Sequence, residues 1–278
     1  MKINIEELAL SQKKEIAQYI KDDTLEIVNQ KITVPHVRES FYTKYGKRLL
    51  DIFLSLIALT LTFPINLFIA IITFFDVGTP IIFKQQRIGK NQSPFTIYKF
   101  RNMKNTTDAN GELLPSSQRV TKWGKFVRKT SLDELLNFVS ILKGDMSLIG
   151  PRPLLDYYAE RLNDYHKVIY QIRPGLECPS LNKEDIKYSW QERLDTYVWY
   201  AEHCSLWIDI KLCVQVLQMV IDHQSSAQRS QAGNGGFMGY DIHGNVIYSK
   251  AVPEKYVIKF LEEHNYKSLD EAIGKRYL

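Results

Sequence analysis

The sequence predicts an α+β fold, mainly helical with short β-ribbons, in a monotopic membrane protein whose re-entrant helical hairpin is broken by a proline. Three observations predict it. Residues 52–75 carry no charge over 24 positions, which is long enough for a membrane helix. Several other segments repeat apolar residues at helical spacing. Residues 80–103 alternate apolar and polar residues in two short stretches, as a two-stranded ribbon does.

The composition is that of a globular protein. The chain has 278 residues, 45% of them hydrophobic and 24% charged, which excludes a disordered or low-complexity protein. Lys and Arg number 36 against 31 Asp and Glu, and the net charge of +5 is too mild to indicate a nucleic-acid partner, so we expect none. The three cysteines form no C-x-x-C pair and the six histidines are scattered, so neither a disulfide framework nor a zinc site is indicated.

The uncharged run either crosses a membrane or enters and leaves it on one side. A straight helix of this length would rise ~36 Å, enough for a hydrocarbon core of ~30 Å. Pro64 lies in its middle, where it removes a backbone N–H and clashes with the preceding turn. A bend there gives two arms of ~18 Å, each reaching about halfway through the apolar layer.

The charges on either side of the run favour the hairpin. Residues 31–48 carry five Lys or Arg and one Glu, and residues 76–104 carry six Lys or Arg and one Asp. Because positive charge marks the cytoplasmic side, these flanks place both ends of the run in the cytoplasm. The two alternatives are a single kinked helix that spans the membrane and a buried core helix of a soluble protein.

Local patterns predict the other elements in order. Residues 1–30 form a polar helix with a loose apolar face. The ribbon at 80–103 turns at Gly89, Lys90 and Asn91. Periodicity and composition then predict helices over 132–142, 155–170 and 205–222, a linker at 225–239, a hairpin around 243–245 and two short helices after it.

The densest group of candidate functional residues is TKWGKFVRKTSLDELLNF, residues 121–138. Ser131 and Glu134 fit the S-x-x-E capping box, which by itself would explain the acidic pair Asp133 and Glu134. In the functional alternative the helix start binds a phosphate, one carboxylate attacks phosphorus and its neighbour holds a divalent cation. The neighbouring Arg128 and Lys129 would favour the ionised form of both carboxylates.

Three further basic residues are candidates for phosphate binding. Arg152 lies between two prolines in GDMSLIGPRP, and a guanidinium held in place binds phosphate through two hydrogen bonds. Lys99 and Arg101 in YKFRNM fall on one face of a strand. A solvated arginine in a turn and a solvated strand face are the corresponding structural alternatives.

Four motifs occur in an order that resembles one family. They are KRLLDIFLSLIALTLTFP, FKQQRIGKNQSPFTIYKFRNM, SLDELLNFVSILKGDMSLIGPRPLL and SLWIDIKLC, and they cover about residues 44–222. Together they resemble the bacterial sugar transferase family, the monotopic polyprenyl-phosphate phosphoglycosyl transferases.

The resemblance implies an activity and residue roles. A sugar 1-phosphate passes from a UDP-sugar to a polyprenyl (undecaprenyl) phosphate with release of UMP, which begins lipid-linked glycan assembly on the cytoplasmic face of the bacterial inner membrane. Asp133 resembles the nucleophile that forms a phosphoryl-aspartate intermediate, and Glu134 resembles its partner, with Mg²⁺ held by the pair. Pro64 matches the break in the re-entrant helix. The candidate phosphate-binding residues are Lys99, Arg101, Arg128 and Arg152.

One stretch departs from the family pattern. After Arg173-Pro174-Gly175 the family commonly continues with a T-G-x-x-Q type stretch, whereas this chain continues with LECPS at 176–180. The departure concerns recognition of the donor more than the chemistry.

These features divide the chain into four segments. They are an N-terminal polar helical segment (1–40), a re-entrant membrane anchor (41–76), a cytoplasmic catalytic domain (77–224) and a linker with a C-terminal extension (225–278). We expect the extension to fold over its own or a neighbouring subunit, the second arrangement giving a homo-oligomer. Two other functions stay open, a catalytically silent membrane scaffold for glycosyltransferases and a membrane-surface phosphatase or phosphodiesterase.

Overall fold

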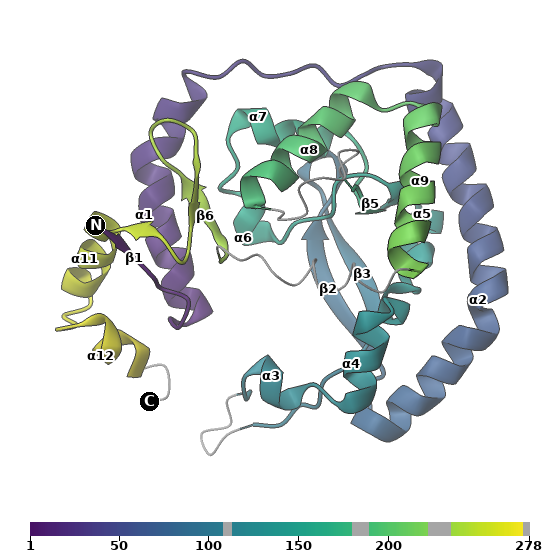
Figure 1. Cartoon of the computed structure of the whole chain (residues 1–278), viewed down its shortest axis with the longest axis horizontal. Helices are drawn as coiled ribbons and strands as arrows, with labels where there is room; N and C mark the ends of the chain where they lie inside the picture. The colour runs from purple at the N-terminus through teal and green to yellow at the C-terminus, as the bar shows by residue number, and fades with distance from the viewer. Residues whose placement is uncertain (108–112, 180–188, 222–234, 275–278) are drawn as a thin grey trace.

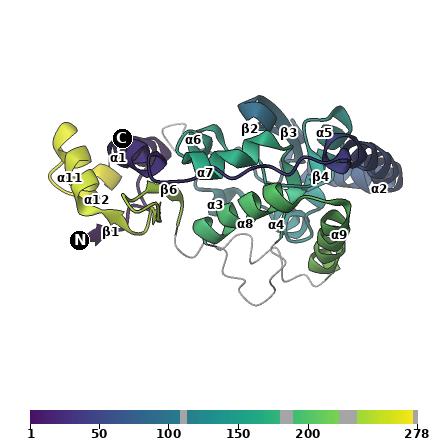
Figure 2. The same ribbon diagram turned by 90° about the horizontal axis from the view of Figure 1, so that it is seen from above.

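The computed structural model of the chain describes residues 1–107, 113–179, 189–221 and 235–274. The long helix α2 lies on one side of the molecule and a lobe formed by both ends of the chain lies on the other (Figures 1 and 2). Between them is the central body, which we define as the described residues from 80 to 221. The mixture of helices and strands agrees with the predicted α+β class.

The ribbon of the central body forms where the sequence predicts it. β2 (Ile82–Ile88) and β3 (Pro94–Phe100) pair antiparallel from Ile82 opposite Phe100 to Ile88 opposite Pro94. A 3₁₀ turn at Lys90–Gln92 joins the strands. Ile97 and Phe100 are buried and lie on opposite faces of β3, so core packing fixes the strand from both sides.

The remainder of the central body consists of short helices, a parallel strand pair and two longer helices. In chain order these are α3 (Ser116–Arg119), α4 (Lys122–Lys129), α5 (Asn137–Lys143), β4 (Ser147–Ile149), α6 (Asp156–Ala159), α7 (Asp164–Lys167), β5 (Gly175–Glu177), α8 (Trp190–His203) and α9 (Leu206–Ile221). The 3₁₀ turns Leu132–Glu134 and Val168–Gln171 complete it.

Two predicted helices differ in outcome. The helix expected over 205–222 is α9. The single helix expected over 155–170 is wrong, because the segment is divided into α6, α7 and a 3₁₀ turn. The division has a local cause, since the Asn163 side chain accepts a hydrogen bond from the backbone N–H of His166 and starts a new helix there.

Both ends of the chain fold together into the lobe, which has its own apolar core. α1 (Leu10–Asn29) packs against β6 and α11, and the first strand β1 pairs antiparallel with β8. The lobe's remaining elements are β1 (Lys2–Ile3), β6 (Phe237–Tyr240), β7 (Val246–Tyr248), β8 (Val252–Pro253), α11 (Glu254–Glu263) and α12 (Leu269–Gly274). The predicted N-terminal helix, hairpin and two short helices are therefore confirmed, whereas residues 225–234 of the predicted linker lie outside the described residues.

The C-terminal extension contacts the central body of its own chain. Phe237 and Tyr240 share an apolar cluster with Trp190 and Tyr197 of α8. The Tyr240 hydroxyl also lies 2.6 Å from Nδ1 of the buried His166. Of the two arrangements expected for the extension, the structure contains the one within a single subunit, and the oligomeric state stays a prediction.

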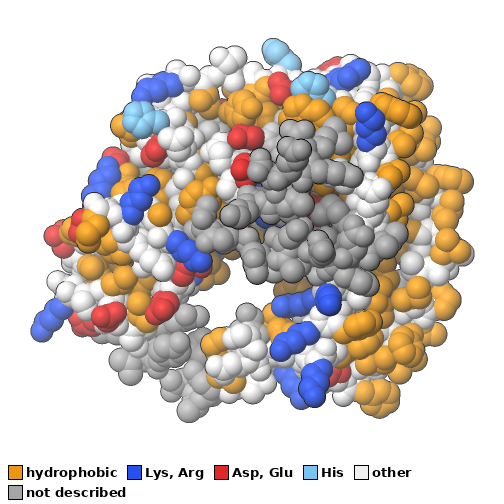
Figure 3. Space-filling view, viewed as in Figure 1, with side chains coloured by type: hydrophobic (Ala, Val, Ile, Leu, Met, Phe, Trp, Pro, Cys, Tyr) orange, Lys and Arg blue, Asp and Glu red, His pale blue; other side chains and the backbone are white. Residues whose placement is uncertain are grey.

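The uncharged run forms one curved helix. α2 (Lys47–Val77) is continuous through Pro64 and follows a single π-helical turn at Tyr42–Gly46. The break into two arms expected at Pro64 is therefore wrong, because a proline inside a helix removes one backbone hydrogen bond and can bend the helix without ending it. Only 11% of the most apolar 18-residue stretch of this helix is buried in the structure, so the alternative of a buried core helix of a soluble protein is wrong. Hydrophobic side chains gather along this edge of the molecule (Figure 3). The exposed ones include Leu49, Phe53, Leu56, Leu61, Phe63, Leu67, Phe68, Ile71, Phe74 and Phe75.

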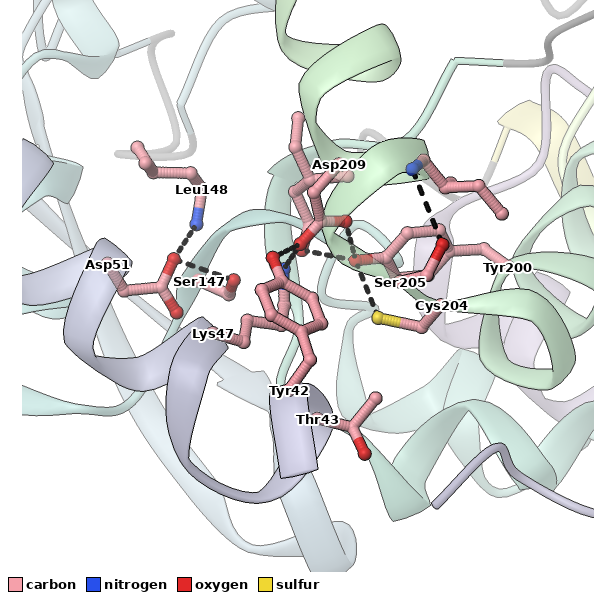
Figure 4. Close-up of polar contacts among 12 residues, drawn as sticks. Tyr42, Thr43, Lys47, Asp51, Ser147, Leu148, Tyr200, Cys204, Ser205 and Asp209 are labelled. Atoms are coloured by element: carbon pink, nitrogen blue, oxygen red, sulfur yellow. Dashed lines mark hydrogen bonds and ion pairs between the residues drawn. The ribbon is translucent and has the colours of Figure 1, made fainter. Parts of the chain in front are cut away.

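A buried polar network fastens the N-terminal end of α2 to α8 and α9 (Figure 4). Lys47 Nζ lies 2.6 Å from Asp209 Oδ2, and the Tyr42 hydroxyl donates to the same oxygen at 2.5 Å. The Tyr200 hydroxyl donates to Asp209 Oδ1 at 2.6 Å. A buried ion pair holds its place when further hydrogen bonds satisfy its remaining atoms, as these two tyrosines do for Asp209.

The same end of α2 also contacts β4. Asp51 Oδ1 accepts hydrogen bonds from the Ser147 hydroxyl at 2.9 Å and from the Leu148 backbone N–H at 3.0 Å (Figure 4). β4 leads directly into the loop that carries Arg152, so the apolar helix α2 and this loop share one support.

The C-terminal end of α2 is fastened to the central body as well. Arg101 donates hydrogen bonds to the carbonyl oxygens of Val77 and Thr79, which satisfies a helix-end carbonyl. The Thr121 hydroxyl donates to Asp76 Oδ2 at 2.5 Å. Both ends of the apolar helix are thus bound to one body.

Candidate active site

A cavity of about 690 Å³ opens between the β2–β3 ribbon, the turn at Leu132–Glu134, the loop after β4, the end of β5 and α8. All the predicted site residues except Pro64 lie in its wall: Lys99, Arg101, Arg128, Asp133, Glu134 and Arg152. Its described lining contains six basic and three acidic side chains, and such an excess of positive charge suits an anionic ligand.

The acidic pair lies on a 3₁₀ turn and not at the start of an α-helix. Ser131 has a positive φ of 58° and its side chain makes no cap hydrogen bond, so the capping box expected from S-x-x-E is wrong. α5 begins three residues later, at Asn137. The physical reason is that the Glu134 side chain is held by two cations across the cavity instead of reaching back to the chain.

Glu134 is the member of the pair whose negative charge is offset by cations. Its Oε1 lies 2.7 Å from Lys99 Nζ and 2.5 Å from Arg152 Nη2. Burial by itself would raise the pKa of Glu134, but the charges of Arg152 and Lys99 outweigh burial and lower that pKa to about 2. Glu134 is therefore ionised throughout the neutral range.

Asp133 has the opposite environment. Its side chain is buried, and Oδ2 accepts a hydrogen bond from Asn102 Nδ2 at 3.1 Å. Burial and the negative charge of Glu134 raise the pKa of Asp133 to about 6, although Lys99 and Arg128 act against them. The expectation that neighbouring basic residues would favour ionisation of both carboxylates is correct for Glu134 and wrong for Asp133, because burial dominates there.

Arg152 is held by three acceptors. Nη2 contacts Glu134, Nη1 donates to the Leu176 carbonyl at 3.0 Å, and Nη1 lies 3.5 Å from Glu177 Oε2. The charge of Glu134 raises the pKa of Arg152. The alternative of a solvated arginine in a turn is wrong, as is that of a solvated strand face at Lys99, whose ammonium is paired with Glu134.

The other two basic candidates occupy different places in the wall. Arg101 is buried and its guanidinium joins the cavity to the end of α2 through the carbonyls of Val77 and Thr79. Arg128 lies in the last turn of α4, and burial lowers its pKa while the charge of Asp133 acts to raise it. Phosphate binding by either residue stays a prediction.

Several cavity residues were missed from the sequence. Asn102 directly follows Arg101 and lies in the cavity wall, where it donates to Asp133. Glu177 falls in the stretch that departs from the family pattern. Arg193 and Tyr197 line the cavity from α8, and only the tertiary fold brings that helix to the site.

The oxygen atoms available for a divalent cation come from the acidic pair. The cations on Glu134 both contact Oε1, and Asp133 receives Asn102 on Oδ2. Within the described ranges, no group of three or more His, Cys, Asp or Glu side chains is arranged to hold a metal ion. Mg²⁺ is commonly held by one or two carboxylates together with substrate phosphates and water, so the pair fits Mg²⁺ that arrives with a phosphate ligand.

Comparisons with known proteins place this arrangement in a family. The chain is 37% identical over 176 residues to an uncharacterized sugar transferase, EpsL, of Bacillus subtilis, covering 63% of this chain and 87% of that protein. It is 31% identical over 198 residues to the undecaprenyl-phosphate galactose phosphotransferase of Salmonella typhimurium, covering 64% and 41%. It is 32% identical over 176 residues to the UDP-glucose:undecaprenyl-phosphate glucose-1-phosphate transferase of Escherichia coli, covering 60% and 38%, so the chain spans less than half of these two relatives. The bacterial sugar transferase family model matches residues 42–223, from the turn before α2 to the end of α9, and the chain belongs to that family.

Proposed function

We propose that the protein is a phosphoglycosyl transferase, which moves a sugar 1-phosphate from a UDP-sugar to undecaprenyl phosphate or a similar polyprenyl phosphate and releases UMP. The observation that carries the proposal is the acidic pair in the cavity, where one carboxylate is neutralised by two cations and its neighbour has a raised pKa. The activities for which the Salmonella and Escherichia relatives are named support the same reaction.

Asp133 is the nucleophile in this proposal. With a pKa of about 6 it is about nine-tenths ionised at pH 7, yet it is more basic than an ordinary aspartate. Its carboxylate oxygen attacks the phosphorus that bears the sugar, and the bond from that phosphorus to the bridging oxygen of UMP breaks. UMP leaves with the electron pair, and the sugar phosphate is joined to Asp133.

The second half-reaction uses the same cavity. An oxygen of the polyprenyl phosphate attacks the phosphorus held on Asp133, which forms the lipid diphosphate sugar and restores the carboxylate. A covalent intermediate lets one site serve two anionic substrates in turn. The excess of basic side chains in the wall offsets the charge of whichever phosphate is present, with Arg128 next to Asp133 and Arg152 next to Glu134.

Mg²⁺ is the proposed cofactor, held by Asp133 and Glu134 together with substrate phosphate oxygens. When bound it offsets the charge of the diphosphate and assists the departure of UMP. The low pKa of Glu134 supports this role, because its carboxylate stays ionised at every pH at which the enzyme would work.

The anchor is proposed to be re-entrant, with the central body on the cytoplasmic face of the inner membrane. Lys47 and Asp51 bind one end of α2 to the body, and Arg101 binds the other end to the same body. A helix that crossed the bilayer would have its ends on opposite faces, where a body on one face could not bind both, so the shared attachment supports entry and exit on one side. α4 adds exposed basic residues near the second end, as suits an anionic lipid surface (Figure 3).

UMP release tests the function. Purified protein in detergent is given a panel of UDP-sugars with Mg²⁺, with and without undecaprenyl phosphate, beside Asp133→Asn and the exposed control Glu160→Gln. We expect sustained UMP release that needs both lipid and one donor, full activity in the control and none in Asp133→Asn. Release sustained without lipid would indicate a phosphatase or phosphodiesterase, and silence of the folded protein across the panel would contradict the proposal.

Side-specific labelling tests the topology. Cysteines are introduced one at a time at Glu39 and Lys84, exposed positions before and after α2, in a Cys213→Ser background. Both should react with a membrane-impermeant maleimide in inverted vesicles and neither in intact spheroplasts. Reaction of the two positions from opposite sides would show a spanning helix and contradict the re-entrant anchor.

A further inference from the structure

Arg152 lies between two carboxylates, of which the mechanism above uses one. Glu134 contacts Nη2 at 2.5 Å, and Glu177 Oε2 lies 3.5 Å from Nη1 on the other side of the guanidinium. With Lys99, which lies 2.7 Å from Glu134, the group contains two cations and two anions. The four side chains retain between 16% and 31% exposure and all line the cavity, so a ligand phosphate that approaches Arg152 also approaches Glu177.

The backbone fixes Glu177 in this position. β4 and β5 pair in parallel with Ile149 opposite Glu177, and the Gly150 N–H donates to the Glu177 carbonyl at 3.2 Å. Gly150 and Gly175 lie so close that a Cβ on Gly175 would be 2.2 Å from the Gly150 nitrogen. These contacts hold the backbone of Glu177 next to the loop that carries Arg152, within reach of its guanidinium.

The two carboxylates act differently on Arg152. Glu134 shares its charge between two cations, Lys99 and Arg152, whereas Glu177 places a second negative charge near Nη1 of the guanidinium, through the buried oxygen Oε2. Part of the attraction of Arg152 for a phosphate is therefore cancelled by Glu177. Glu177 lies in the stretch, residues 176–180, in which this chain departs from the family pattern.

We propose that Glu177 is a positioning residue that holds Arg152 toward Glu134 and limits how tightly the cavity binds the pyrophosphate of the donor and the phosphate of the nucleotide product. This inference rests on the proposed function for the identity of its ligands. The consequence is that UMP dissociates faster and that the donor is bound less tightly.

Glu177→Gln tests the inference because it removes the charge and keeps the shape. A partly buried pair of this kind is worth about 1 kcal/mol, which corresponds to about fivefold in affinity. We expect Glu177→Gln to bind UMP and inorganic pyrophosphate about fivefold more tightly by titration calorimetry, and to show a lower KM for the donor with kcat unchanged or reduced. Glu160→Gln, an exposed change of the same type, should bind both probes as the unmodified protein does.

A double-mutant cycle shows whether Glu177 acts through Arg152. In an Arg152→Gln background the Glu177→Gln change should alter pyrophosphate affinity by less than twofold, since the guanidinium it modulates is gone. Unchanged or weaker binding of both probes in Glu177→Gln, an equal effect in the two backgrounds, or failure of pyrophosphate to bind any variant would overturn the inference. Tighter pyrophosphate binding in a protein that turns over no UDP-sugar would instead reject the proposed function and keep the inference.

Discussion

Replacing Asp133 by asparagine should stabilise the protein while it abolishes activity. The carboxylate is 6% exposed and its pKa is raised from 3.8 to about 6, so the folded state disfavours the ionised form. Asparagine has nearly the same shape, and its side-chain oxygen can accept the hydrogen bond that Asn102 donates. The substitution thus removes the charge and leaves the packing.

The magnitude follows from the size of the pKa shift. A rise of about two units corresponds to ~3 kcal/mol of folding free energy that the ionised aspartate costs at neutral pH. The sign of the pH dependence follows from the raised pKa of Asp133, because the folded state is destabilised only at pH values at which this carboxylate is ionised. The difference between the two proteins should be absent below about pH 4, grow between pH 4 and 6, and be complete above pH 6.

The assay is thermal unfolding in detergent, in the presence of EDTA, from pH 4 to pH 8. For a chain of this length ~3 kcal/mol corresponds to roughly 5 °C or more in melting temperature. Asp22→Asn, a change of the same type at an exposed position of α1, is the matched control and should show no such pH-dependent gain. A melting temperature of Asp133→Asn below that of the unmodified protein at pH 7.5, or a gain of equal size at pH 4.5 and pH 7.5, would refute the reasoning.

The remaining predictions concern the supports of the site. Lys99→Met should reduce UMP release by at least tenfold, because Glu134 loses one of its two cations, and a rate within twofold of the unmodified protein would argue against this pairing. Asp209→Asn leaves Lys47 without its anion and should lower stability by ~3 kcal/mol, against ~1 kcal/mol for Tyr42→Phe, both measured by thermal unfolding; equal losses would contradict the buried ion pair. Deletion of residues 225–278 should lower the melting temperature and the yield of extracted protein, since it uncovers the apolar cluster around α8, and a truncated protein of unchanged stability would contradict that packing.

Elements set by local pattern were predictable. The ribbon, α9 and the hairpin near 243–245 form where periodicity and turn residues place them. The site members were also predictable, since the motif residues Lys99, Asp133, Glu134 and Arg152 meet in one cavity. The sequence indicated that these residues belong to one site through the family resemblance, which rests on the order of the motifs along the chain.

Features set by competition between distant groups were not predictable. The S-x-x-E pattern indicates a capping box, but Lys99 and Arg152 outcompete the backbone N–H for Glu134, and neither is near it in sequence. The pKa of Asp133 depends on burial, which a list of neighbouring charges does not contain. The position of Glu177 depends on two glycines in strands that the sequence alone does not pair.

The 3₁₀ turn gives adjacent carboxylates their different chemistry. With three residues per turn, successive side chains are separated by ~120°, so Asp133 and Glu134 leave the backbone in directions that share few partners. Glu134 meets both Lys99 and Arg152, and Asp133 meets only the neutral donor Asn102 among its hydrogen-bond partners in the described chain. Had the two cations paired with Asp133 instead, its pKa would have fallen as that of Glu134 does, and a carboxylate so weakly basic is a poor nucleophile. The different roles of Asp133 and Glu134 therefore come from the direction in which each side chain leaves the backbone. The nucleophile also depends on its neighbour, because the charge of Glu134 contributes to the raised pKa of Asp133.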